Sequence, residues 1–110
     1  MRRRYRETEC GGVDKTYVFK IENETLTEVL PKIRQRSKSG KHGEDTWWLP
    51  NGKYLVIDVS RSNNVTKPYN VVVWCYNVEN DTATRRELAT FISDNVNIAL
   101  IRAKNLAYQC

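Results

Sequence analysis

The chain of 110 residues lacks any long apolar run, which excludes a membrane-spanning helix. No stretch reaches the roughly 18 consecutive apolar residues that such a helix needs, so we expect no membrane partner. The N-terminal stretch Arg2–Arg6 is basic and has no apolar core, so we expect no secretory signal peptide. Three Asn-x-Thr sequences begin at Asn23, Asn64 and Asn80, and without such a signal we interpret them as turns, not as glycan acceptors.

Residues that commonly carry catalysis are also scarce. The only histidine is His42, and no Gly-rich phosphate loop, nucleophile elbow or metal-ligand spacing is present. His42 with Glu44 or Asp45 would supply an acid–base pair for a toxin-like endoribonuclease, and this alternative stays open. A lone histidine in a polar loop is more often simply solvated. We therefore expect a protein that is not an enzyme and takes no cofactor, metal or small-molecule substrate.

Cysteine is rare as well. Cys10, Cys75 and Cys110 are an odd number, and no C-x-x-C pair occurs. This argues against a zinc site and against the disulfide framework of a secreted domain. Cys75 falls within a predicted strand and is interpreted as a small buried apolar residue. Whether Cys10 or Cys110 forms bonds between subunits stays open.

Positive charge, by contrast, is in excess. The chain has 18 lysine and arginine residues against 13 aspartate and glutamate residues, which gives a net charge of +5. The isoelectric point is about 9.2. This balance favours a polyanionic partner and makes nucleic acid a candidate.

The length of the chain predicts one domain with a short arm. The domain divides into a hairpin, an antiparallel meander and a pair of helices. The ranges are 1–14 for the basic N-terminal arm and 15–110 for the domain, within which the hairpin is 15–33, the meander 44–78 and the two helices 83–107.

The hairpin begins with residues 15–22, where apolar and polar side chains alternate as in a half-exposed strand. Residues 25–36 are ambiguous, because Thr25 and Glu28 resemble a helix capping box and the apolar residues fall at helical spacing. Pro31 would cost such a helix about 3 kcal/mol, so we favour a second strand that closes a hairpin. A helix here would instead give the element order of a small monomeric RNA-binding domain of the double-strand-binding kind.

The meander follows a basic loop at residues 34–46. The next segment, DTWWLPNGKYLVIDVS, predicts a strand, a turn and a strand, with Asn51-Gly52 as a strong hairpin signal. SNNVTKP turns the chain again, and residues 69–78 form the last strand. The nearly apolar face of this strand is assigned to the side that the helices cover, and it consists of Tyr69, Val71, Val73 and Cys75.

The last block predicts two short amphipathic helices. Thr84 and Glu87 form a candidate capping box for the first, and a break at Ser93-Asp94-Asn95 separates it from the second. Strands first and helices last indicate an α+β fold, with helices on one face of an antiparallel sheet. The residues expected in the helical core and at a dimer contact are Leu88, Phe91, Ile92, Val96, Leu100, Ala103 and Leu106.

Both faces of the predicted sheet carry large apolar side chains. On one strand Leu55, Ile57 and Val59 share a face, while Tyr54 and Val56 lie on the other. A single copy would expose a larger apolar patch than monomers normally do, so we predict a homodimer.

These blocks, in this order, resemble the coat proteins of single-stranded RNA bacteriophages (levivirus-like). The family's opening hairpin is similar to KTYVFKIENETLTEV, its central meander to EDTWWLPNGKYLVIDVSRSNNVTKPYNVVVW, and its C-terminal helices to RRELATFISDNVNIALIRAKNLAY. Together they cover residues 15 to about 108. The chain shows one strand fewer than the family pattern, and a division at Pro31 into strands 25–30 and 32–38 would supply it.

The resemblance implies a structural capsid protein of the virion, made and assembled in the cytoplasm of a bacterial host. Such coat proteins form intertwined homodimers, in which two sheets join edge to edge into one continuous sheet and the helices clasp the partner. Many dimers close into an icosahedral shell, whose inner sheet face binds and packages the single-stranded RNA genome.

The resemblance also implies candidate RNA-binding residues. Guanidinium and ammonium groups neutralise phosphate, and an aromatic ring stacks on an unpaired base. The positions that match the family's RNA-facing strands are Arg61, Lys67, Tyr69 and Asn70. Non-specific packaging would fall to the Arg2–Arg6 arm and to the basic loop, through Arg34, Arg36, Lys38 and Lys41.

Overall fold

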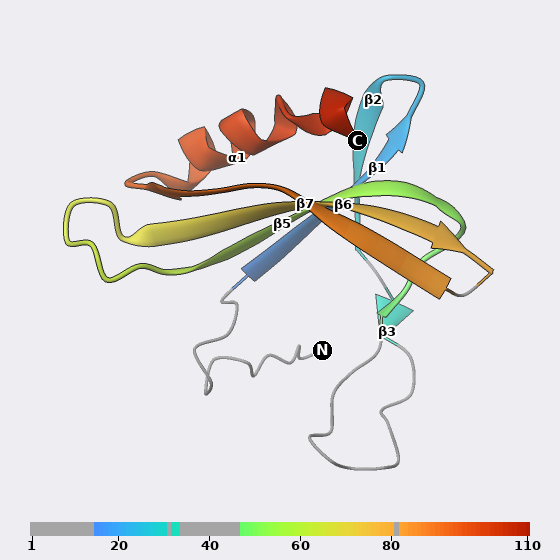
Figure 1. Ribbon diagram of the computed structural model, residues 1–110, viewed down its shortest axis with the longest axis horizontal. Helices are drawn as coiled ribbons and strands as arrows, with labels where there is room; N and C mark the ends of the chain where they lie inside the picture. The colour runs from blue at the N-terminus through green and yellow to red at the C-terminus, as the bar shows by residue number, and fades with distance from the viewer. Residues whose placement is uncertain (1–14, 31, 34–46, 81) are drawn as a thin grey trace, which may run out of the picture.

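The computed structural model of the chain describes residues 15–30, 32–33, 47–80 and 82–110. Its elements are β1 (Lys15–Glu22), β2 (Thr25–Val29), β3 (Lys32–Ile33), β4 (Trp47–Trp48), β5 (Gly52–Arg61), β6 (Tyr69–Glu79), β7 (Thr82–Ser93), the helix α1 (Val96–Lys104) and a 3-10 helix, η2 (Ala107–Gln109). Figure 1 shows α1 on one side of the main sheet and β3 on the other. The predicted α+β class is confirmed. The N-terminal arm and the basic loop at 34–46, with His42, lie outside the described residues.

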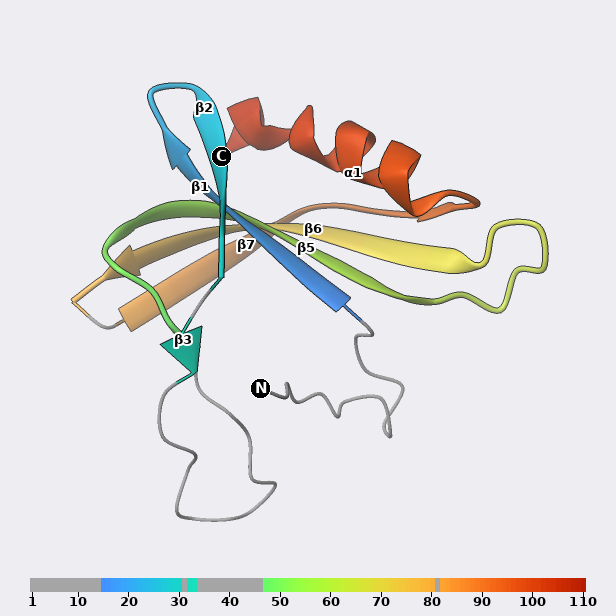
Figure 2. The same ribbon diagram turned by 180° about the vertical axis from the view of Figure 1, so that it is seen from behind.

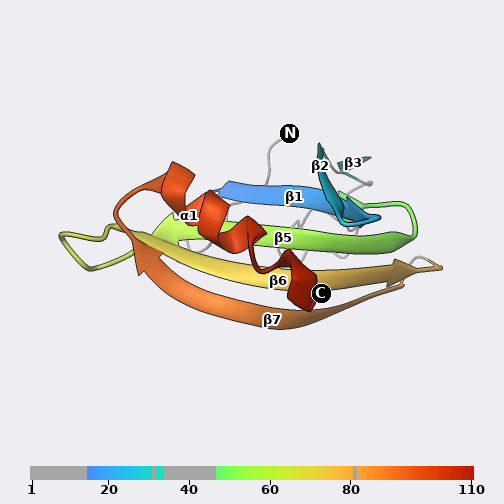
Figure 3. The ribbon, with the colours of Figure 1, turned by 90° about the horizontal axis from the view of Figure 1, so that it is seen from above.

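Five strands make the main sheet, in the order β2-β1-β5-β6-β7, and every neighbouring pair is antiparallel. β3 and β4 pair separately as a short two-stranded sheet. Figure 3 views the main sheet from the helix side, with α1 above the strands and β7 along the outer rim.

The β1–β2 hairpin turns at Asn23 and Glu24, which have φ values of 48° and 64°. Two positive φ angles in a two-residue loop match the twist of the flanking strands, and asparagine tolerates them well. The favoured strand after this turn is confirmed, because β2 pairs with β1 over its whole length. The described residues of 25–36 form strands and no helix. The alternative element order, that of a double-strand-binding RNA domain, therefore lacks its first helix. Figure 2 shows the hairpin turn rising on the same side of the sheet as α1.

The structure divides the chain at the place where a division at Pro31 would supply an extra strand, because β2 ends at Val29 and β3 begins at Lys32. The described strand β3 spans Lys32–Ile33 and pairs outside the main sheet, and the rest of 32–38 lies outside the described residues. The predicted partner of β4 is wrong, however. β4 pairs with β3, not with β5 through Asn51-Gly52. The reason is that β1 and β6 already occupy both edges of β5. The side chain of Asn51 instead accepts a hydrogen bond from the Asn80 amide at 3.0 Å.

The helix-covered face holds the main core. Leu55 and Ile57 of β5 and Val73 of β6 are fully buried in a cluster that also contains Ala99 and Ala103 of α1. Small side chains on the inner face of α1 allow the helix to approach the strands closely. The predicted helix-covered face of β6 is confirmed. Its alternate residues, which all lie on this side, are Tyr69, Val71, Val73 and Cys75.

The opposite face forms a second, smaller core. Val18 and Val56 are only 2% exposed and Tyr54 is fully buried, and Trp74 packs against them. The Tyr54 hydroxyl donates to the Pro50 carbonyl oxygen at 2.6 Å, which satisfies its buried polar group. One copy therefore buries these residues of the second face, so they offer no apolar surface to the predicted homodimer.

The first of the two predicted helices is a strand. β7 pairs with β6 from Thr82 to Ser93, so the capping box at Thr84 and Glu87 does not form. The segment is rich in threonine and also carries Phe91 and an isoleucine, which suit a pleated surface packed on neighbours. A long open edge on β6 lets this preference prevail over the helical spacing.

A β-bulge at Val73/Trp74 of the β6–β7 ladder interrupts the alternation of β7. Leu88 and Phe91 pack against the helix-side core, whereas Ile92 lies on the opposite face. Of the seven residues expected on two helices, Leu88, Phe91 and Ile92 therefore lie on β7, Val96, Leu100 and Ala103 lie on α1, and Leu106 follows α1.

The second predicted helix is confirmed as α1. Asn95 caps its N-terminus, because its side chain accepts a hydrogen bond from the Ile98 amide at 2.9 Å. Arg102 and Lys104 lie in the last turn, where cations interact favourably with the helix dipole.

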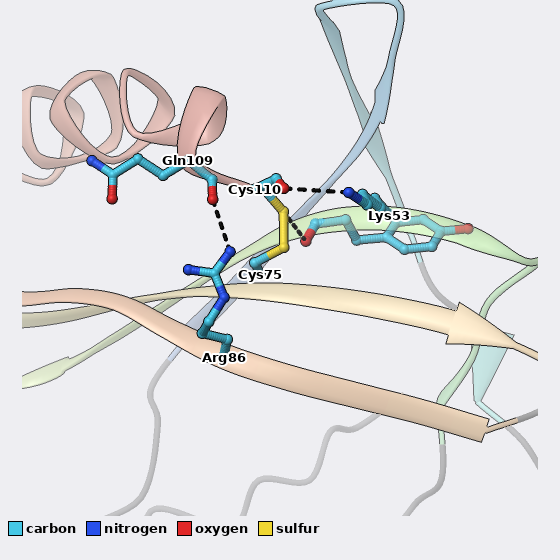
Figure 4. Close-up of a disulfide and its surroundings, with 6 residues drawn as sticks. Lys53, Cys75, Arg86, Gln109 and Cys110 are labelled. Atoms are coloured by element: carbon cyan, nitrogen blue, oxygen red, sulfur yellow. Dashed lines mark hydrogen bonds between the residues drawn. A yellow bond between two sulfur atoms is a disulfide. The ribbon is translucent and has the colours of Figure 1, made fainter.

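The C-terminal turn is bonded to the sheet. Cys75 and Cys110 form a disulfide with a Cα–Cα distance of 5.5 Å. Figure 4 shows Arg86 Nη2 donating to the Gln109 carbonyl oxygen at 2.8 Å and Lys53 Nζ donating to that of Cys110 at 3.3 Å. Reading Cys75 as only a buried apolar residue was wrong. α1 returns the chain over β6, a proximity that sequence spacing does not reveal.

Candidate nucleic-acid interface

The structure does not gather the predicted RNA-binding residues on one surface. Arg61 and Tyr69 are opposite each other at the ends of β5 and β6, and Tyr69 packs against the helix-side core. Asn70 lies on the other face, opposite Ser60 and Ile92. The remaining candidates, Arg34, Arg36, Lys38, Lys41 and the Arg2–Arg6 arm, lie outside the described residues.

Lys67 belongs to the loop that joins β5 to β6. The Asn64 side-chain oxygen accepts hydrogen bonds from the amides of Thr66 at 3.0 Å and Lys67 at 2.9 Å. Ser62 N donates to the Pro68 carbonyl oxygen at 2.7 Å and closes the loop. Interpreting Asn64 as turn chemistry is therefore confirmed, and the loop presents an exposed Lys67 at the end of the sheet.

The face away from α1 carries a row of cations and aromatic rings that the sequence analysis missed. Lys20, Tyr54, Tyr76 and Arg85 are cross-strand neighbours on four successive strands. Lys20 Nζ lies 5.8 Å from the centroid of the Tyr54 ring, and Arg85 Nη1 donates to the Tyr76 hydroxyl at 3.4 Å. Cations therefore border this aromatic row on both sides.

Trp74 lies in the next row and contacts Arg85. The Arg85 guanidinium carbon is 4.2 Å from the centroid of the Trp74 ring, which is a close cation–π contact. Trp74 Nε1 donates to Asp58 Oδ2 at 3.1 Å, and Thr16 Oγ1 donates to Asp58 Oδ1 at 2.9 Å. Four strands thus hold the indole ring and the guanidinium in one arrangement.

Asp58 is the charged group at the centre of this arrangement. Burial raises the pKa of its carboxyl, because desolvation disfavours the charged form. The hydrogen bonds from Thr16 and Trp74 and the charge of Arg85 oppose that shift without cancelling it. The carboxylate balances Arg85 and fixes the orientation of the indole.

Cations on the helix side have a different role. Arg102 lies 4.0 Å from the Phe91 ring centroid and Lys104 lies 4.8 Å from that of Phe19. Both residues are exposed, and their long side chains cover aromatic rings of the helix side, as lysine and arginine commonly do on apolar surface. They make this side basic while contributing to its packing.

β7 forms one edge of the main sheet, and in the part of the chain that the structure describes no strand pairs with its outer side. It is 12 residues long. Its charged residues Arg85, Arg86 and Glu87 lie in the first half, and Leu88–Ser93 carries no charge. An open strand edge of this kind is a template for pairing with another chain.

Two large apolar side chains of α1 are exposed on its outer side. Ile98 and Ile101 lie one turn apart and are each 60% exposed, and Tyr108 in η2 is 82% exposed. Exposed apolar side chains grouped along one element are typical of an interaction surface.

Within residues 15–30, 32–33, 47–80 and 82–110, no group of three potential metal ligands comes together. No helix among them is long and apolar enough to cross a bilayer. Comparison of the chain with protein-family models, with curated proteins and with solved structures gives no match.

Proposed function

We propose that this chain is the coat subunit of a single-stranded RNA phage, which dimerises, assembles into an icosahedral shell and packages RNA. The virion assembles in the cytoplasm of the bacterial host, and the RNA lies on the sheet face away from α1. The observation that carries this proposal is the long open edge of β7. The block order of the sequence and the net charge of +5 support it.

The β7 edge is suited to a two-fold contact. Two antiparallel copies of β7 centred on Thr90 pair Ala89 with Phe91, and both of these residues lie on the helix side of the sheet. This register uses the uncharged half of the strand and leaves Arg85 outside the ladder, so no like charges meet. The two sheets then form one continuous sheet, and the edge that would otherwise promote disordered association is closed.

The exposed residues of α1 give the dimer a second contact. Burying Ile98 and Ile101 against a partner removes apolar surface from water at about 25 cal/mol per Å². The helix lies above the sheet (Figure 3). Trp74 lies on the opposite face, because its neighbour Val73 packs toward the helix-side core. Dimerisation through β7 and α1 therefore leaves the proposed RNA face open.

A pair of lysine substitutions on the edge strand tests the proposal. Thr90→Lys with Ile92→Lys places like charges across the two-fold axis, whereas Val65→Lys adds a lysine to the exposed β5–β6 loop and serves as the control. Light scattering during size-exclusion chromatography should give a dimer or larger species for the wild type and Val65→Lys, and a monomer for the double variant. A double variant that keeps the wild-type mass excludes β7 as the contact.

A further inference from the structure

We infer that Trp74 and Arg85 form a stacking platform for an unpaired RNA base, with Asp58 as a positioning residue. This inference rests on the proposed RNA-binding function and specifies how one part of the ligand is recognised. The occupant is a nucleobase of single-stranded RNA.

The contact between Trp74 and Arg85 is the first feature that supports the platform. A guanidinium is planar and has two faces, and Arg85 covers the indole with one of them at 4.2 Å. Arg85 is exposed, and the proposal places the base against its other face. Unpaired bases stack on arginine planes and on aromatic rings, whereas bases within a duplex already stack on each other. The platform therefore favours single strands.

The fixed orientation of the indole is the second feature that supports the platform. Its N–H is committed to Asp58, which Thr16 holds from the other side, and its ring packs against the second core beside Val56. A ring fixed in advance loses little freedom when a base binds, so more of the stacking energy appears as affinity.

The charge of the sheet face away from α1 is the third feature that supports the platform. Among the residues of this face that the structure describes, Lys20 and Arg85 are the cations. Lys20 is paired with Glu22 at 3.7 Å, and the carboxyl of Asp58 lowers the net charge beside Arg85. Glu87 lies opposite Trp74 in the register. A face with such balanced charge gains little from phosphate neutralisation, so base stacking supplies most of its affinity and the salt dependence of this contact is weak.

The experiment compares Arg85→Lys with Arg86→Lys. Arg85→Lys keeps the positive charge and removes the planar guanidinium. Arg86 serves as the control because it is the next residue but lies on the helix side, where it donates to the Gln109 carbonyl oxygen. Fluorescence anisotropy with a labelled single-stranded oligoribonucleotide should show about tenfold weaker binding for Arg85→Lys, at an unchanged slope of log Kd against log salt. Arg86→Lys should bind like the wild type. On an oligonucleotide with abasic sites, wild type and Arg85→Lys should bind equally.

A second readout tests the positioning role of Asp58. Trp74→Phe assigns the indole N–H resonance of Trp74 in a nitrogen-correlated NMR spectrum, and RNA should shift that resonance in the wild type. Asp58→Asn should move it before RNA is added and should weaken binding severalfold. Binding of Arg85→Lys equal to that of the wild type would overturn the platform and leave the proposed RNA-binding function standing. A wild type that binds no RNA would overturn both.

Discussion

Cys110 is bonded to Cys75, 35 residues earlier in the chain, and this bond fixes the C-terminal turn above β6. Arg86 and Lys53 hold the carbonyl groups of the same turn. A covalent link between β6 and residue 110 therefore joins the sheet, α1 and η2 into one unit.

The disulfide predicts a redox-dependent stability. Opening a loop of this length restores chain entropy to the unfolded state and should cost about 3–4 kcal/mol. Urea unfolding with and without a thiol reductant measures the difference. Cys110→Ser should unfold at the reduced wild-type midpoint and should not respond to reductant. If the reductant left the wild-type unfolding midpoint unchanged, the disulfide would contribute nothing to the stability of the fold.

The packing of α1 on the sheet depends on its small residues. Ala103 is fully buried, so Ala103→Leu forces a larger side chain into a filled space and should destabilise the fold by about 1–3 kcal/mol. Asn97→Leu adds the same side chain at an exposed position of the helix and should stay within about 0.5 kcal/mol. Equal unfolding free energies for the two variants in urea would contradict this packing.

Asp58 predicts a pH dependence of stability. Because its folded-state pKa lies above the ordinary value of 3.8, the folded state binds a proton more tightly than the unfolded state does. The stability that this group contributes is present below 3.8 and is lost as the pH rises through the folded-state pKa. The free energy of unfolding of the wild type should therefore fall, relative to Asp58→Asn, from acidic to neutral pH. Parallel pH profiles for the two proteins would rule this out.

The outer side of α1 predicts a concentration dependence. If Ile98 and Ile101 are buried between copies, the wild-type melting temperature should rise with protein concentration, because association stabilises the folded state. Ile98→Ser with Ile101→Ser should weaken that dependence, and Val65→Ser should not. Calorimetric scans across a range of concentrations compare the three proteins, and the same slope for all of them would count against a contact through α1.

Local sequence patterns predicted correctly those elements for which the local pattern and the tertiary surroundings favour the same structure. Alternation predicted β1, turn signals predicted β5 and β6, and the nearly apolar face of β6 predicted the side that α1 covers. The cost of Pro31 in a helix favoured a strand for β2. β7 was mistaken for a helix because Thr84 and Glu87 satisfy a capping pattern, whereas the open edge of β6 decides the structure.

Long-range proximity could not be predicted from spacing. Trp74 and Arg85 meet because β7 is a strand that pairs with β6, so their contact could not be predicted while that segment was expected to be helical. The Cys75–Cys110 bond likewise depends on how α1 returns over the sheet. The implied RNA-binding set divided between two faces because side chains alternate across a strand, which places Tyr69 and Asn70 on opposite sides.

The molar mass of the purified wild type in solution is the most direct test of whether two copies share the β7 edge. Sedimentation equilibrium should give about twice 12.9 kDa, or a far larger particle if shells assemble. A mass of 12.9 kDa at every concentration, with and without added RNA, would contradict the coat-subunit proposal.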